Sequence, residues 1–129
     1  MALKGIHNRR ISSTFFKPSK NNLHDPFKLK GMRRAVNHII KQKELGNKIL
    51  IFGDYDVDGY SSTYLLYDFI TKLNTQCDFY IPNRFIDGYG PNKNLLSKLI
   101  NKKKYSLIFF VDCGSNSSEE ILYLEKIGL

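Results

Sequence analysis

Residues 48–59 of this 129-residue chain read KILIFGDYDVDG, an apolar run that ends in three aspartates at alternating positions. The four apolar residues from Ile49 to Phe52 are typical of a strand that is buried on both faces of a sheet. The glycines and aspartates that follow predict a tight loop. The aspartates therefore lie at the carboxyl end of a strand, which is the edge where open α/β sheets bind their ligands.

Asp54, Asp56 and Asp58 bring three negative charges into this loop. At an effective dielectric constant of 20, two charges about 4 Å apart repel each other by roughly 4 kcal/mol. A divalent cation would offset this repulsion. Aspartates that only cap a turn explain one or two of the three. The loop is therefore a candidate metal site.

A second strand repeats this design. Residues 107–111 are wholly apolar and are followed by Asp112, Cys113 and Gly114. A helical pattern follows each of the two strands, which implies parallel neighbours that are joined by right-handed crossovers. We expect Asp112 to face the first aspartate cluster. The sequence therefore predicts an α/β fold, a parallel sheet with helices on both faces.

The rest of the sequence predicts four helices and one further strand. Apolar spacing and turn residues predict a helix from Leu29 to Gly46, a helix over 60–73, a strand over 77–81, and helices over 91–103 and 117–127. The helix over 60–73 should bury Leu66, Phe69, Ile70 and Leu73. We expect two parts, a basic irregular segment over 1–28 and an α/β domain over 29–129.

The charge of the chain is unevenly distributed. The net charge is +8, but residues 1–48 hold 12 Lys or Arg against 2 acids, whereas residues 49–129 hold 8 against 10. A basic leading segment beside an acidic, site-bearing body suggests a polyanionic partner such as nucleic acid. The alternative is that the lysines only keep the protein soluble.

The amino-acid composition indicates the class of protein and its place in the cell. The chain has 42% apolar and 25% charged residues, which is typical of a globular domain. It has no apolar run near 18 residues and no secretory signal, so no membrane partner is expected. Cys77 and Cys113 fit a reducing cytoplasm better than a disulfide scaffold, and we do not expect them to pair.

Residues 82–90 read PNRFIDGYG and form a second candidate site. Arg84 offers a planar donor fork for a phosphate oxygen, or it stacks as a surface arginine on a neighbouring ring. Gly88 and Gly90 let the backbone approach a ligand closely, and Tyr89 can stack on a base. Beside a carboxylate metal site, these four residues predict phosphate binding.

The aspartates allow three other interpretations. The spacing Asp-x-Asp-x-Asp-Gly opens an EF-hand calcium loop, but Leu65 stands where that loop needs a bidentate glutamate. A phosphohydrolase of the haloacid dehalogenase type also places Asp-x-Asp after an apolar strand. Asp54 would then be a covalent nucleophile and Asp56 an acid or base. A non-catalytic nucleic-acid-binding or metal-binding module is a third possibility.

Three segments together resemble a known family. Gly53 to Gly59, Ile81 to Gly90, and Val111 to Gly114 are similar to the first three motifs of the DHH phosphoesterases, in particular the RecJ single-stranded-DNA exonucleases. Residues 23–32 resemble the segment that precedes these motifs. The resemblance covers nearly the whole chain, in the same order and with the same spacing.

This resemblance implies a 5′-to-3′ exonuclease that acts on single-stranded DNA in recombination and repair. It implies that Asp54, Asp56, Asp58 and Asp112 are catalytic metal ligands or their close partners, and that Arg84 contacts a phosphate. The implied cofactors are two Mn²⁺ or Mg²⁺ ions, and hard oxygen ligands suit both metals. Partners other than DNA are not implied.

The resemblance does not extend to the motif that gives the family its name. The family takes its name from an Asp-His-His motif that lies shortly after the third motif, and this sequence ends before that motif. We therefore expect an amino-terminal fragment that holds one half of a metal site. By itself it should bind metal weakly and show little or no nuclease activity.

Overall fold

The computed structural model describes residues 8–129 and divides the chain into two units, one up to Val36 and one from Asn37 to Leu129. The first unit contains helix α1 (Arg9–Phe16) and the short 3₁₀ turns η2 (Lys20–Asn22) and η3 (Pro26–Lys28). The prediction that residues 1–28 are irregular is therefore wrong for α1, and its first seven residues lie outside the described part. Helix α1 forms because Asn8 accepts a hydrogen bond from Ile11 N–H (2.9 Å) and so caps the first turn.

Helix α2 (Met32–Glu44) agrees with its predicted extent to within a few residues and ends before Gly46, which has a φ of +66°. Its buried polar residue is Gln42. The Gln42 side chain lies 3.1 Å from His38 Nε2 and accepts a hydrogen bond of 2.7 Å from Asn47 Nδ2. This amide network fixes the turn that leads into the first strand.

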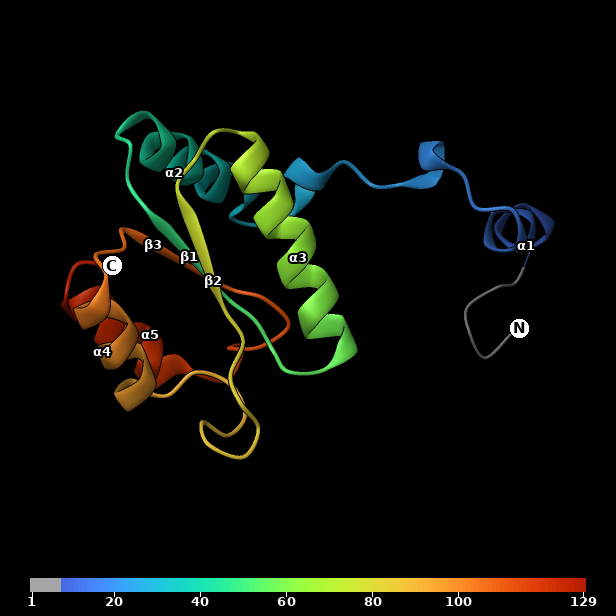
Figure 1. Cartoon of the computed structure of the whole chain (residues 1–129). Helices are drawn as coiled ribbons and strands as arrows, with labels where there is room; N and C mark the ends of the chain where they lie inside the picture. Colours follow the sequence, from blue (N-terminus) through green and yellow to red (C-terminus); the bar gives the residue numbers. More distant parts are fainter. Residues whose placement is uncertain (1–7) are drawn as a thin grey trace. The chain divides into compact units, whose positions relative to one another are not determined.

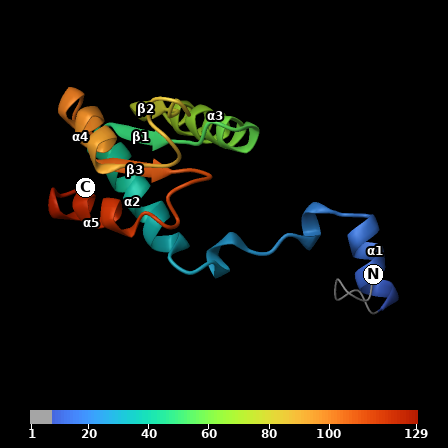
Figure 2. The same ribbon diagram turned by 90° about the horizontal axis from the view of Figure 1, so that it is seen from below.

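The sheet consists of three parallel strands, β1 (Ile49–Phe52), β2 (Cys77–Tyr80) and β3 (Leu107–Phe110). Figure 2 shows β1 between the other two, in the order β2-β1-β3. In this register Phe52, the last residue of β1, is paired with Tyr80 of β2 on one side and with Phe110 of β3 on the other. Whatever follows these residues is therefore gathered at one edge of the sheet.

Helices cover both faces of the sheet, which confirms the predicted fold class. Helix α3 (Val57–Lys72) packs on one face, against β1 and β2, whereas α4 (Lys93–Lys102) and α5 (Ser118–Lys126) lie on the other face (Figure 1). On the α4 and α5 side the core is formed by Phe52, Leu95, Leu96 and Leu124. All four β1 residues are at most 1% exposed, as their unbroken apolar run predicts.

Helix α3 begins at Val57, three residues before its predicted start. Asp56 causes this difference, because its side chain accepts a hydrogen bond from Gly59 N–H (2.9 Å) and so caps the helix three residues earlier. The predicted buried stripe is also partly wrong, because Phe69 is 57% exposed.

Two glycines allow α3 to lie directly against the end of β1. A Cβ added at Gly53 would lie 3.2 Å from Thr63 Cβ and 2.9 Å from Ile81 Cδ1. A Cβ at Gly59 would lie 2.6 Å from Asp54 Cβ. Any side chain at Gly59 would therefore displace Asp54 or the start of the helix.

Among residues 8–129, no helix combines the length and the apolar character that crossing a membrane requires.

Candidate metal centre

Three aspartates from two separate segments of the chain meet at the carboxyl edge of the sheet. Asp54 follows β1, Asp56 caps α3 and Asp112 follows β3. Each offers a carboxylate oxygen, and these oxygens all lie within 4.8 Å of one another. The structure thus brings together three of the four predicted aspartates, with Asp112 facing the first cluster as its position after β3 predicts.

The backbone fixes two of these carboxylates and leaves each with a second oxygen. Asp54 is 3% exposed, and its Oδ1 accepts a hydrogen bond of 2.7 Å from Tyr55 N–H. Asp56 Oδ1 accepts the N–H of Gly59 at the helix cap. A carboxylate has two oxygens, so both residues can hold a cation through Oδ2 without giving up these bonds.

Asp112 occupies an uncommon backbone conformation, with a φ of +60°. Aspartate is one of the few residues that tolerates this left-handed region, at some cost in free energy. Burial raises the pKa of its carboxyl group, and the negative charges of Asp56, Asp58 and Asp54 raise it further. These neighbours act against the ionised form of Asp112, and a bound cation would act in its favour.

The donor set fits a hard divalent cation. Carboxylate oxygens are the preferred ligands of Mg²⁺ and Mn²⁺. No basic side chain that the structure describes forms an ion pair with these three carboxylates, so the chain leaves their charge uncompensated. A cation bound through Asp54, Asp56 and Asp112 would supply the missing charge.

Asp58, the fourth predicted ligand, does not belong to this group. It lies exposed in the first turn of α3, because the helix begins earlier than predicted. Its charge still reaches the cluster, since it raises the pKa of Asp112.

Cys113 lies beside the cluster but remains a neutral thiol. Its Sγ donates weakly to the carbonyls of Phe52 and Gly53, each at 3.7 Å. Burial raises the pKa of this thiol to about 11, and the charge of Asp54 adds to the effect. The Cys113 sulfur is not among the ligand atoms that lie within 4.8 Å of one another, so the thiol is not part of the cluster. Both cysteines are free, as predicted.

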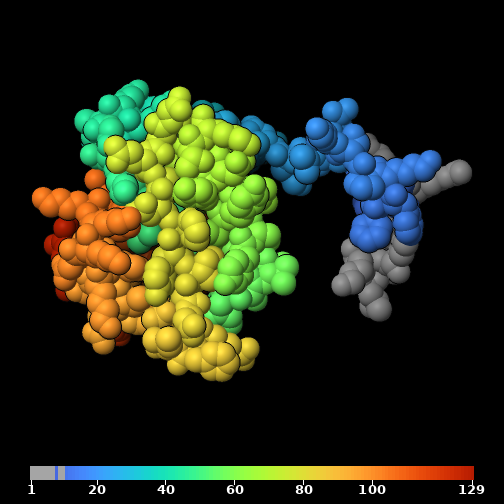
Figure 3. Space-filling view, viewed as in Figure 1, coloured from blue at the N-terminus to red at the C-terminus, as the bar shows by residue number. Residues whose placement is uncertain are grey.

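The predicted phosphate-binding loop meets the aspartate loop through aromatic contacts. Arg84 Cζ lies 5.6 Å from the centre of the Tyr55 ring, and the Tyr55 and Tyr89 rings pack edge to face at 6.1 Å. Figure 3 shows the loop after β2, in gold, at the surface beside the start of α3, in green. Gly88 is exposed and an added Cβ there would meet open space, whereas Gly90 is buried.

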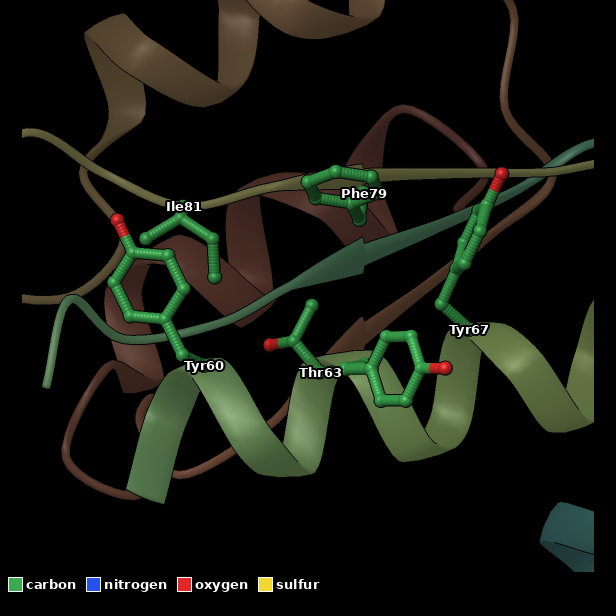
Figure 4. A pocket seen from close by; sticks show the side chains of 6 residues that line it. Tyr60, Thr63, Tyr67, Phe79 and Ile81 are labelled. Atoms are coloured by element: carbon green, nitrogen blue, oxygen red, sulfur yellow. The ribbon is translucent and has the colours of Figure 1, made fainter. Parts of the chain in front are cut away.

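A separate hollow of about 240 Å³ lies between α3 and β2 (Figure 4). Its lining consists of Tyr60, Thr63, Tyr64, Tyr67, Phe79 and Ile81. It contains no carboxylate and no basic group, so it is not part of the candidate metal centre.

Two polar contacts at β2 were not predicted from the sequence. Tyr80 donates its hydroxyl to Asp87 (2.9 Å), and Tyr105 donates to Asp78 (2.8 Å). The second pair is separated by 27 residues, and no local pattern signals it. The first pair spans a loop that is dense in turn formers, which is the one signal that could have indicated it.

A parallel sheet with clustered aspartates at its carboxyl edge is typical of α/β proteins that bind a metal there. Comparison with known proteins identifies the family. The model of the DHH family, N-terminal domain, matches residues 48–129. The chain therefore belongs to the DHH family. This membership decides against the calcium-loop and haloacid dehalogenase interpretations.

The similar curated proteins are single-stranded-DNA-specific exonucleases named RecJ. The Bacillus subtilis protein is 36% identical over 98% of this chain, and the Haemophilus influenzae protein is 33% identical over 81%. The chain spans 16% and 18% of the lengths of these two relatives.

Solved structures agree with this family. An exonuclease RecJ bound to manganese superimposes with a TM-score of 0.71, at 30% identity, over 78% of this chain and 26% of that protein. RecJ from Thermus thermophilus in complex with Mn²⁺ gives a TM-score of 0.65, at 26% identity, over 78% of this chain and 14% of that protein.

Proposed function

We propose that this chain forms the amino-terminal, metal-binding part of a RecJ-type exonuclease that hydrolyses single-stranded DNA from the 5′ end in recombination and repair. The observation that carries the proposal is the meeting of Asp54, Asp56 and Asp112 within 4.8 Å, in a chain similar to RecJ proteins over nearly its whole length. The resident cations would be Mn²⁺ or Mg²⁺, held by these three residues, with Asp58 close enough to influence them electrostatically.

Each residue has a defined task in this proposal. When bound there, hard divalent cations would supply Lewis-acid chemistry for an in-line displacement by water at a phosphodiester. Asp54, Asp56 and Asp112 hold the positive charge at the sheet edge. Arg84 donates to a phosphate oxygen, and Tyr89 offers a ring for an unstacked base beside Gly88 and Gly90.

The ligand count sets the expected affinity. Three carboxylates fill only part of the shell of a hard cation that prefers six oxygen ligands. We therefore expect the 129 residues by themselves to bind Mn²⁺ weakly and to show little nuclease activity. We also propose a cytoplasmic location, since both cysteines are free and neither is placed to pair.

Mn²⁺ titration followed by electron paramagnetic resonance tests the site. We expect Asp56→Asn and Asp112→Asn to weaken Mn²⁺ binding at least tenfold, whereas Asp78→Asn, on the same sheet but at the opposite edge, leaves it unchanged. Parental Mn²⁺ affinity in the first two variants would contradict the site.

A nuclease assay with a 5′-labelled single strand tests the activity. Slow Mn²⁺-dependent release from the 5′ end, abolished by Asp56→Ala, would support an enzyme. Salt-dependent DNA binding with no cleavage to lose would instead indicate a non-catalytic binding module. Rapid digestion by this chain alone would contradict the expectation that its site is partial.

A further inference from the structure

One carboxylate organises the loop between β2 and α4, and this carboxylate is not part of the metal cluster. Asp87 Oδ2 accepts hydrogen bonds from the Tyr80 hydroxyl (2.9 Å) and from Asn83 N–H (2.8 Å). Asp87 N–H donates back to the Asn83 carbonyl at 2.8 Å. These three bonds close residues 83–87 into a turn and tie that turn to the last residue of β2.

Arg84 lies inside this turn, and both of its flanks are fixed. The Asn83 side chain accepts hydrogen bonds from Phe85 N–H (2.9 Å) and Ile86 N–H (3.3 Å), so its oxygen bridges the backbone around Arg84. At the other end of the loop, Asn92 Nδ2 donates to the Asp87 carbonyl (3.2 Å), while Asn92 Oδ1 caps α4. The loop is therefore anchored to a strand and to a helix through Asp87.

Tyr80 connects this anchor to the hydrophobic core. Its ring lies 5.7 Å from the Phe52 ring at the end of β1. Burial and the Asp87 carboxylate raise the pKa of the Tyr80 hydroxyl to about 12. The hydroxyl therefore stays protonated and donates to Asp87 throughout the neutral range.

We propose that Asp87 is a positioning residue that holds Arg84 in place for a phosphate group of a DNA strand, through its hydrogen bonds to Tyr80 and Asn83. The inference rests on the proposed function, in which Arg84 contacts a phosphate. Asp87 touches neither the strand nor the metal ligands. It acts by keeping the turn closed, so that Arg84 stays beside Tyr55 at the edge of the aspartate cluster.

Simple electrostatics predicts the opposite effect of removing Asp87. Loss of a negative charge raises the net charge of the chain, and a more positive protein binds DNA more tightly. Positioning instead predicts that Asp87→Ala weakens binding, because the turn opens and Arg84 loses its place. Asp87→Asn separates the two effects, since its amide oxygen can accept both hydrogen bonds without the charge.

The first test measures DNA binding by the whole chain, by fluorescence anisotropy with a labelled oligothymidylate and with Ca²⁺ as the divalent cation. Loss of one phosphate contact should reduce the slope of log K against log salt concentration by about 0.7. We expect this reduction for Arg84→Ala and most of it for Asp87→Ala. Asp87→Asn should keep the parental slope and bind at least as tightly as the parent, and the double variant Arg84→Ala/Asp87→Ala should match Arg84→Ala.

The second test needs neither DNA nor metal. Hydrogen exchange should show protected amides at Asn83 and Asp87 in the parent, and roughly tenfold faster exchange there in Asp87→Ala and Tyr80→Phe. Tyr105→Phe is the matched control, because it removes an equivalent tyrosine-to-aspartate bond, to Asp78, at the other edge of the sheet. It should lower stability without changing loop exchange or the salt slope.

The outcomes separate the inference from the function on which it rests. If Arg84→Ala keeps the parental affinity and slope, the phosphate contact itself is wrong and the positioning role fails with it. If Arg84→Ala loses the contact but Asp87→Ala keeps the parental slope, only the positioning role is overturned. Tighter binding by Asp87→Ala would show that its charge, and not its place in the turn, governs DNA binding.

Discussion

The carboxylates at the two edges of the sheet differ in whether basic side chains contact them. At the amino edge, Asp78 of β2 is contacted by Lys103 (2.8 Å) and Lys48 (3.4 Å) and accepts the Tyr105 hydroxyl (2.8 Å). At the carboxyl edge, three aspartates lie close together, and no described basic side chain of residues 8–129 forms an ion pair with them. The described residues therefore provide the partners of Asp78, whereas the clustered aspartates still need a cation from solution.

The pKa directions express the same difference. Burial alone would raise the pKa of Asp78, but hydrogen bonds from Lys103, Tyr105 and Lys48 outweigh it and lower the pKa below 3.8. At the other edge, burial and neighbouring carboxylates raise the pKa of Asp112. The pKa of Asp78 is thus lowered by the partners that the chain provides, whereas the pKa of Asp112 is raised by the carboxylates around it.

The largest expected effect comes from Gly59→Ala, which breaks the carboxyl edge sterically. The new Cβ would lie 2.6 Å from Asp54 Cβ, so we expect a loss of about 3 kcal/mol in the free energy of unfolding and loss of Mn²⁺ binding. Chemical denaturation and Mn²⁺ titration measure the two effects. Gly88→Ala, in open space at a φ of +78°, is the control and should cost about 1 kcal/mol. Similar costs for the two variants would contradict the tight packing at Gly59.

Divalent cations should stabilise the carboxyl edge in a way that depends on its charge. Mn²⁺ at a hundred times its dissociation constant should raise the free energy of unfolding by about 2.7 kcal/mol. Without metal, Asp112→Asn should raise the melting temperature, because it removes a charge that its neighbours repel and because asparagine tolerates a positive φ. The melting temperature of this variant should no longer rise when Mn²⁺ is added. Asp78→Asn should show the reverse pattern. A lower metal-free melting temperature in Asp112→Asn would refute the comparison.

Asp78→Ala tests the amino edge. We expect it to lower the free energy of unfolding by about 2 kcal/mol at pH 7. Lys103 should contribute little to this loss, because it is half-exposed and solvent screens its charge. Since the folded-state pKa of Asp78 lies below its unfolded value, its contribution is fully present above the unfolded value of 3.8 and is lost as the pH falls through the folded value. Urea unfolding of parent and variant should therefore differ by a constant amount at neutral pH and converge below pH 4. A difference that persists in strong acid would point to packing instead of charge.

The smallest effect is expected away from both edges. Lys72 pairs with Asp68 on the exposed surface of α3 at 2.7 Å, with the lysine side chain 73% exposed. Lys72→Ala should change the free energy of unfolding by less than about 0.5 kcal/mol, because exposed pairs one helical turn apart contribute little. Thermal melting at low and high salt measures it. A loss comparable to that of Asp78→Ala would mean that exposure does not decide what an ion pair contributes here.

Local patterns predicted most of the fold. The apolar runs at residues 49–52 and 107–110 mark strands buried on both faces, and their trailing aspartates predicted the meeting of Asp54 with Asp112. The start of α3 was missed because Asp56 was interpreted only as a ligand, although an aspartate before a helical pattern is also a strong N-cap. One side chain does both here, since each of its oxygens can serve a different partner.

Contacts between distant residues could not be predicted in this way. Asp78 meets Lys103 and Tyr105 only after β2 and α4 have packed together, and sequence spacing carries no sign of it. The exposure of Phe69 has the same origin, because helical spacing gives the period of an apolar stripe but not how much of it the sheet covers. The position of Asp87 was visible in the sequence, whereas its role depended on where the Tyr80 hydroxyl points.

The edge-to-face pair of Tyr55 and Tyr89 gives the cluster a spectroscopic property of its own. The chain has eight tyrosines and no tryptophan, so its near-ultraviolet absorption and emission come from tyrosine. One ring of the pair belongs to a residue between two of the clustered aspartates, and the other packs against it at 6.1 Å. A luminescent lanthanide such as Tb³⁺, bound by those oxygens, would have an energy donor beside it. Sensitised emission would therefore report cation binding at the proposed site in the wild-type chain, with no label attached.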